Sequence, residues 1–159
     1  RIKQERKDSR YEIIKYNTEE QNMAVIEELI REEETGALSF GNFALAAKTK
    51  KDGFQYQGDS YKIKTFREIT KLERNGMFVY ESVPGTVVHD FRATDKAVNF
   101  VVEGEEDSQI TLELEAEREY KIHIDKVYVG KMKTNLGGKL NLSVELEPSK
   151  MVDILVEKI

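Results

Sequence analysis

The amino-acid sequence predicts a mainly β protein built from two antiparallel parts. Runs of β-branched and aromatic residues are separated by glycine-containing turn dipeptides from Gly36 onward. Apolar and polar residues also alternate through the C-terminal part of the chain. We therefore expect an immunoglobulin-like antiparallel β-sandwich over residues 84–159. Residues 23–83 are expected to form a smaller antiparallel β lobe that begins with a short helical segment.

The first 22 residues differ in character from the rest of the chain. They carry many charges and isolated apolar residues without a sustained period. We expect residues 1–22 to be a charged N-terminal arm that is either disordered or not native to the protein. Met23, followed by Ala24 and Val25, is the candidate for a native first residue.

A helix is expected over about residues 19–34. Thr18 and Gln21 have the spacing of a capping box, and apolar side chains follow at helical intervals at Met23, Ile26, Leu29 and Ile30. The alternative is a β-hairpin in which the segment ELIREEE pairs with ALSFG about a turn at Thr35-Gly36. The pattern alone leaves both structures open.

Four dipeptides mark turns between residues 52 and 85. Asp52-Gly53 is expected to separate FALAAKTK from FQYQ, and Gly58-Asp59 to introduce the strand SYKIKTF. Asn75-Gly76 favours a type I′ hairpin turn, because both residues tolerate a positive φ. Pro84-Gly85 favours a turn after MFVYESV, because proline presets φ and glycine is free to take a positive one.

The C-terminal part has the clearest strand pattern. Apolar side chains occupy alternate positions in runs around residues 98–102, 110–114, 120–124 and 140–146. Because successive side chains of a strand point to opposite faces, each run has one face for a core and one for solvent. Asn135 to Gly138 supplies a tight reversal before the fourth run, and MVDILVEKI is expected to be the last strand.

The composition excludes several classes of site and partner. The chain has no cysteine, so it has no disulfide, thiolate metal site or thiol nucleophile. Its 25 basic and 30 acidic residues are interspersed without a basic stripe, which argues against nucleic acid and membrane partners. No apolar run has the length of a transmembrane helix, and no phosphate-binding loop is present. We expect a cytoplasmic protein that uses no cofactor.

Two groups of residues are candidates for ligand or metal binding. Tyr56 and Tyr61 flank a predicted hairpin tip that carries Asp59, so the tip could present aromatic rings beside a carboxylate, as sugar-binding patches do. The acidic residues Glu103, Glu105 and Asp107 follow one another in a predicted loop, where clustered oxygens could bind calcium. The alternative interpretations are core tyrosines and a hydrated acidic turn.

The sequence contains no recognisable catalytic constellation. His89 and His123 are the only histidines, and both are expected to be ordinary surface residues. A glycan-active hydrolase would need convergent arginines and carboxylates. The residues available for such a cleft are Arg67, Arg74, Arg92, Glu73, Asp90 and Glu103.

Residues 23–159 resemble a family of small bacterial proteins labelled "endosialidase catalytic beta chain". The segments SFGNFAL, GDSYKIKTFREITKLERNGMFVYESVPGTVVHDF, SQITLELE and KTNLGGKLNLSVELE carry the resemblance. The label implies a glycan-active hydrolase. The S-x-D-x-G-x-T-W box of sialidases is absent, so the resemblance assigns no catalytic residue.

The predicted function is that of a non-catalytic binding or assembly module. Exposed edge strands favour self-association, because their unpaired backbone groups can pair with another strand. The alternatives are an endosialidase-like hydrolase and a carbohydrate-binding accessory module.

Overall fold

The computed structural model describes residues 25–159, which consist of β-strands, turns and loops and contain no helix. All strand pairs are antiparallel. The strands are β2 (Ile30–Glu32), β3 (Leu38–Phe40), β4 (Thr49–Tyr56), β5 (Asp59–Phe66), β6 (Ile69–Arg74), β7 (Met77–Val83), β8 (Val87–Ala93), β9 (Ala97–Glu103), β10 (Ser108–Glu113), β11 (Glu119–Ile124), β12 (Val127–Lys133), β13 (Lys139–Val144) and β14 (Val152–Lys158). The predicted fold class, all-β and antiparallel, is confirmed.

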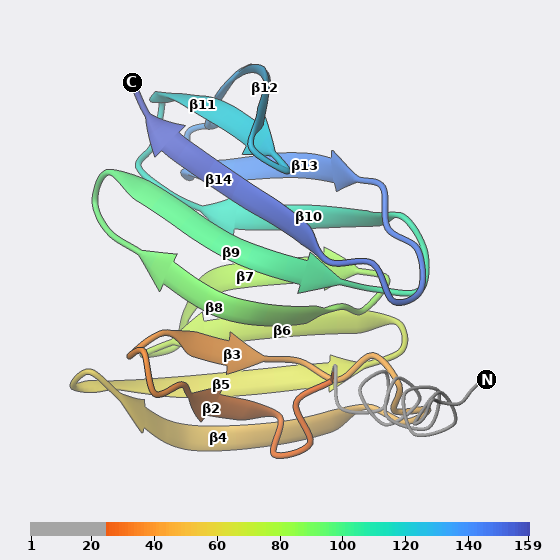
Figure 1. The fold of residues 1–159 in the computed structure, drawn as a ribbon. Helices are drawn as coiled ribbons and strands as arrows, with labels where there is room; N and C mark the ends of the chain where they lie inside the picture. Colours follow the sequence, from red (N-terminus) through yellow and green to blue (C-terminus); the bar gives the residue numbers. More distant parts are fainter. Residues whose placement is uncertain (1–24) are drawn as a thin grey trace.

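The strands form two sheets that lie one behind the other (Figure 1). One sheet has six strands in the order β13-β10-β7-β6-β5-β4, and the other has seven in the order β12-β11-β14-β9-β8-β3-β2. Each sheet contains strands from both sides of position 84. The two predicted parts of the chain therefore contribute to common sheets.

The inner faces of both sheets share one hydrophobic core. Its centre is aromatic: the Tyr80 ring packs edge-on against Phe40 and Phe100, with ring centroids 5.3 and 5.7 Å apart. Phe91 packs against Phe40 and Phe100 as well. Such edge-to-face pairs add to the stabilisation from buried area. The core joins residues from β3, β7, β8 and β9, which come from both predicted lobes.

The predicted helix over residues 19–34 is wrong for the part that the structure describes. Residues 25–34 form turns and strand β2, which pairs with β3 so that Ile30 lies opposite Phe40. The alternative hairpin is confirmed, with Gly36 at φ +90° in its turn. Residues 19–24, like the predicted arm and the capping box, lie outside the described residues. Burial of Ile30 against the core outweighs the helical spacing.

The predicted turns have mixed outcomes. Asn75-Gly76 joins β6 to β7 with positive φ at both residues, as a type I′ turn requires. Asp52-Gly53 separates no strands; it lies within β4, at an irregularity in the pairing with β5. Pro84-Gly85 connects β7 to β8, which belong to different sheets, so this turn passes the chain from one sheet to the other.

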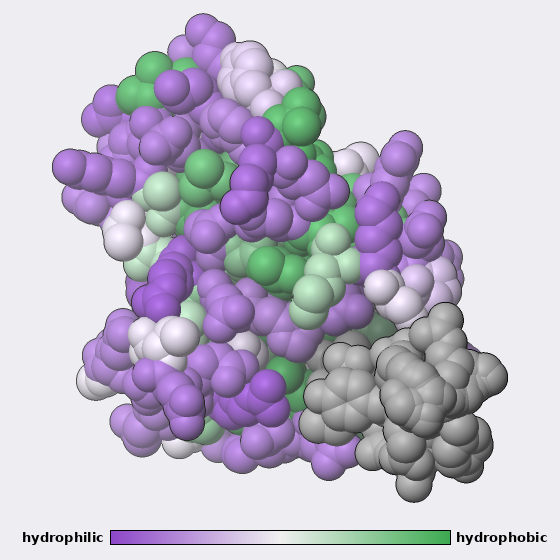
Figure 2. Space-filling view, viewed as in Figure 1, coloured by the Kyte–Doolittle hydropathy of each residue, from purple (hydrophilic) through white to green (hydrophobic). Residues whose placement is uncertain are grey.

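The outer surface of the seven-stranded sheet is mostly hydrophilic, with apolar residues in its central part (Figure 2). Residues 25–159 include no helix with the length and apolar character needed to cross a membrane.

Candidate functional site

The structure places the predicted ring patch inside the molecule. Tyr56 and Tyr61 are 8% and 7% exposed, and their rings pack edge to face with centroids 5.6 Å apart. The Tyr56 hydroxyl donates to the carbonyl oxygen of Gly36 at 2.6 Å. Asp59 accepts a hydrogen bond from the Asn75 side chain. The tyrosines are core residues, so neither ring forms an open stacking surface at the β4–β5 tip.

The predicted calcium loop does not assemble a metal site. Within residues 25–159, no group of three or more histidine, aspartate or glutamate side chains has an arrangement that could hold a metal ion. Glu103 is buried beside His89, with His89 Nε2 and Glu103 Oε1 3.3 Å apart, whereas Glu105 and Asp107 are exposed. Asp107 accepts the backbone N–H of Leu146, which fixes the loop.

His89 is therefore not the surface residue that the sequence predicts. Its side chain is 14% exposed and lies next to the Glu103 carboxylate. Neither facing atom of this pair makes a well-formed hydrogen bond within the described residues. His123, in strand β11 of the same sheet, is half-buried and packs against the Tyr128 ring.

The arginines and carboxylates listed for a hydrolase are dispersed. Arg92 donates to the Thr35 carbonyl oxygen, Glu73 lies 3.5 Å from Lys71, and Glu103 lies beside His89. Of the six residues, only Arg74 lines the cleft that lies between the two sheets at one end of the molecule. The structure does not bring the predicted hydrolase residues together.

That cleft, of about 580 Å³, opens between the two sheets at one end of the molecule. Its walls come from the β6–β7 turn, the β8–β9 turn, and the segment that follows β10. Apolar and polar residues both line it. The apolar ones include Phe78, Val79, Phe91, Val98, Leu112 and Leu114, and the polar ones include Arg74, Thr94, Asp95, Glu113 and Glu115.

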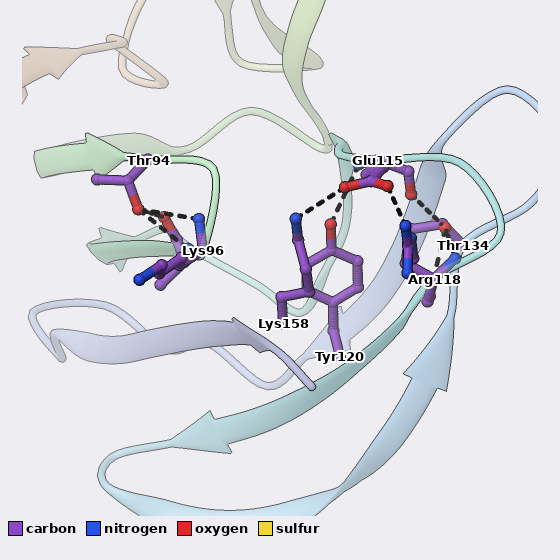
Figure 3. A network of polar contacts seen from close by, with 8 residues as sticks. Thr94, Lys96, Glu115, Arg118, Tyr120, Thr134 and Lys158 are labelled. Carbon is purple, nitrogen blue, oxygen red and sulfur yellow. Dashed lines mark hydrogen bonds and ion pairs between the residues drawn. The ribbon is translucent and has the colours of Figure 1, made fainter.

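One wall of the cleft is held by a polar network centred on Glu115 (Figure 3). Lys158 Nζ and Arg118 Nε each lie 2.7 Å from a different oxygen of its carboxylate. The backbone N–H of Glu115 donates to the Tyr120 hydroxyl, and its carbonyl oxygen accepts from the Thr134 hydroxyl. The hydrogen bonds from Lys158 and Arg118 lower the pKa of Glu115. This carboxylate is therefore ionised at neutral pH.

Both carboxylates that line the cleft next to the end of β10 are paired with cations. Glu113 bonds to Lys139 Nζ at 2.7 Å, and Glu115 bonds to Lys158 and Arg118. The Thr94 hydroxyl accepts the N–H groups of Lys96 and Ala97, which fixes the β8–β9 turn opposite this wall (Figure 3). A concave cleft that combines apolar side chains with a few fixed polar groups is typical of ligand sites.

A shallower hollow of about 420 Å³ lies on the outer face of the seven-stranded sheet. It is lined by Asn99, His123, Lys126, Asp153 and Leu155. The Asn99 amide donates to Asp153, and the buried Nδ1 of His123 has no hydrogen-bond partner among the described residues. This hollow is more open to solvent than the cleft between the sheets.

Sequence reasoning identified Arg74 but missed Phe78, Glu115 and Tyr120. These residues sit at strand ends and turns, and nothing in their local pattern marks them as neighbours. The charged run Glu115 to Glu119 was the available signal, because a charged segment between two alternating runs marks a strand end at one edge of a sandwich. Comparison of the chain with protein-family models, curated proteins and solved structures gives no match.

Proposed function

We propose that the protein is a non-catalytic binding module whose ligand enters the cleft between the two sheets. The observation that carries this proposal is a cleft lined both by apolar residues and by carboxylates that are already paired with cations. The cleft volume of about 580 Å³ falls within the range of small-molecule sites. The ligand class is an amphipathic molecule, with an apolar ring for the apolar part of the lining and a polar group for its polar part.

The same geometry counts against the endosialidase-like alternative. Hydrolysis of a glycosidic bond needs one carboxyl that carries a proton at the working pH, beside a second carboxylate or other nucleophile. Glu113 and Glu115 are both paired with cations, and Arg74 is the single arginine that lines the cleft. A carbohydrate-binding role would need another surface, since Tyr56 and Tyr61 are in the core.

Filling the cleft should abolish binding of an apolar probe. Val79 lies at the irregularity between β6 and β7 and lines the cleft, so Val79→Trp would occupy part of its volume. We expect 1-anilinonaphthalene-8-sulfonate to bind the folded wild-type protein with enhanced fluorescence. Val79→Trp should weaken that binding by about tenfold or more, equivalent to roughly 1.4 kcal/mol.

Val129→Trp is the matched control, because Val129 is exposed on β12 and does not line the cleft. It should leave probe affinity unchanged. Equal probe binding by the wild-type protein and Val79→Trp would place the probe elsewhere and overturn the proposed site. Release of reducing ends from polysialic acid by the wild-type protein would overturn the non-catalytic assignment.

A second candidate function, assembly with another copy of the chain, is supported by strand β12. This strand is the edge of the seven-stranded sheet, and its side chains are exposed on both faces, including Val127, Tyr128 and Val129. Antiparallel pairing of two copies about Gly130 would set Lys131 opposite Val129 and Lys133 opposite Val127. No lysine would face another lysine, so the pairing avoids like-charge repulsion.

Light scattering over a concentration series tests this assembly. The wild-type protein should shift from monomer to dimer as concentration rises. Val129→Lys should remain monomeric, because it would place two lysines opposite each other in the pair. A wild-type protein that stays monomeric at all concentrations would contradict the assembly candidate while leaving the cleft proposal intact.

We also propose that the fold is an immunoglobulin-like sandwich and that the protein is cytoplasmic. Two face-to-face antiparallel sheets with one core support an immunoglobulin-like sandwich. The absence of cysteine supports a reducing compartment, the cytoplasm.

A further inference from the structure

Strand register gathers lysines on the outer face of the six-stranded sheet. Lys50 in β4 pairs with Lys64 in β5, and Lys64 pairs with Lys71 in β6, so three lysines form a straight row across three neighbouring strands. Their neighbours Ile63, Thr65 and Leu72 are buried on the inner face, which places the row on the outer face. Lys62 is two residues from Lys64, and Lys48 is two residues from Lys50. We call the surface formed by these five lysines the lysine face.

This arrangement is unfavourable for the isolated protein. Like charges directly opposite each other on neighbouring strands, about 4.8 Å apart, are destabilising. Partial burial and the ammonium groups of Lys48, Lys71 and Lys50 lower the pKa of Lys64. The acidic neighbours are fewer: Glu73 lies 3.5 Å from Lys71, and Glu81 pairs with Lys71 in the next strand. The lysine face is thus a concentrated positive surface on a chain of net charge −5.

An apolar row runs beside the lysine row. Phe66 pairs with Ile69, and Val83 follows Ser82, which pairs with Thr70. Continued by one residue, this register places the three side chains in line, two residues along the strands from Lys64, Lys71 and Glu81. Val83 is 50% exposed, and Phe66 and Ile69 are partly exposed. The lysine face therefore offers a line of positive charge and, parallel to it, a line of apolar side chains.

We propose that the lysine face binds an acidic, amphipathic segment of a partner protein. Carboxylates of such a segment would meet the row from Lys50 to Lys71, and its apolar side chains would meet the row from Phe66 to Val83. The apolar row favours a polypeptide over a nucleic acid. The phosphates of a nucleic acid would pair with the lysines but would make no favourable contact with the exposed valine and isoleucine side chains. The site is separate from the cleft, so this proposal does not depend on the proposed function.

Fluorescence anisotropy with the full chain tests the proposal. The probe is a labelled peptide of six Glu-Val repeats, and the comparison peptide has six Glu-Ser repeats. We expect the Glu-Val peptide to bind the wild-type protein at low salt and more weakly at high salt. Lys64→Glu should weaken this binding by at least about tenfold. The Glu-Ser peptide should bind the wild-type protein more weakly than the Glu-Val peptide.

Lys121→Glu is the matched control, because Lys121 is exposed on β11 in the other sheet. It should leave affinity unchanged. Lys64→Glu should fold normally, with a melting temperature that is unchanged or roughly 1–4 °C higher, because the new carboxylate would lie between Lys50 and Lys71. Equal losses in both variants, equal affinities for the two peptides, or tighter binding of a single-stranded oligodeoxythymidine of the same charge would overturn the proposal.

Discussion

Gly85→Ala is expected to destabilise the protein by about 3 kcal/mol or more, with a fall in melting temperature of about 6–12 °C. Gly85 lies in the connection that carries the chain from β7 in one sheet to β8 in the other. A methyl group built on Gly85 would lie 2.1 Å from the carbonyl oxygen of Phe66 and 3.2 Å from that of Arg67. Both contacts are with backbone, which cannot move aside as a flexible side chain can.

The close approach at Gly85 has a structural cause. Its N–H donates to the Arg67 carbonyl oxygen at 2.9 Å, which ties the inter-sheet connection to the turn between β5 and β6. Separation of the two segments to admit a methyl group would break this hydrogen bond and leave polar backbone groups buried. The substitution therefore affects the junction of both sheets rather than one turn.

Gly137→Ala is the control for this prediction. Gly137 also lies in a turn, but a methyl group there would find its nearest neighbour, the Asn135 side-chain oxygen, at an ordinary 3.5 Å. Urea unfolding should place Gly137→Ala within about 0.5 kcal/mol of the wild type. Similar unfolding midpoints for the two alanine variants would show that the Gly85 contact does not limit stability.

The C-terminal strands were predictable because their local pattern agrees with their environment. Leu140, Leu142 and Val144 are buried, whereas Asn141 and Ser143 between them are exposed, as the alternation predicts. The N-terminal segment was not predictable in this way. Ile26, Leu29 and Ile30 have helical spacing, but the energy that decides their conformation comes from distant residues, including Phe40 opposite Ile30.

The sites were less predictable than the strands. They depend on which strands are neighbours in a sheet, and local sequence patterns do not reveal this. The cleft joins the turns after β6, β8 and β10, and the order of strands in the sheets is what brings these turns together. The lysine face has the same origin. Along the sequence its lysines are interspersed with acidic residues, so no basic stripe is visible. On the sheet surface, strand pairing aligns three of these lysines in one row.

A buried hydroxyl network also depends on long-range order, and it lies next to Gly85. The Thr86 hydroxyl is 2.8 Å from the Tyr80 hydroxyl and 2.7 Å from that of Ser82, and all three side chains are fully buried. The backbone of Thr86 is held by the Thr70 hydroxyl through both its N–H and its carbonyl oxygen. Burial raises the pKa of Tyr80, and its hydrogen bonds to Thr86 and Ser82 offset part of that rise.

Thr86→Val should therefore destabilise the protein by about 2–4 kcal/mol, because it keeps the side-chain shape but removes the hydroxyl that the Tyr80 and Ser82 hydroxyls share. Thr111→Val, on the outer face of β10, should cost no more than about 0.5 kcal/mol, since its partner Asn141 can bond to water instead. The two effects are to be measured by urea unfolding.

A double-mutant cycle separates lost hydrogen bonding from altered packing. Tyr80→Phe removes the hydroxyl that bonds to Thr86. The loss of unfolding free energy in the double variant Tyr80→Phe with Thr86→Val should therefore be smaller than the sum of the losses in the two single variants. The reason is that Thr86→Val leaves the buried Tyr80 hydroxyl without Thr86 as its partner, whereas in the double variant that hydroxyl is absent. Strictly additive losses would mean that the two hydroxyls do not depend on each other, and the cost of Thr86→Val would then belong to packing around the inter-sheet connection.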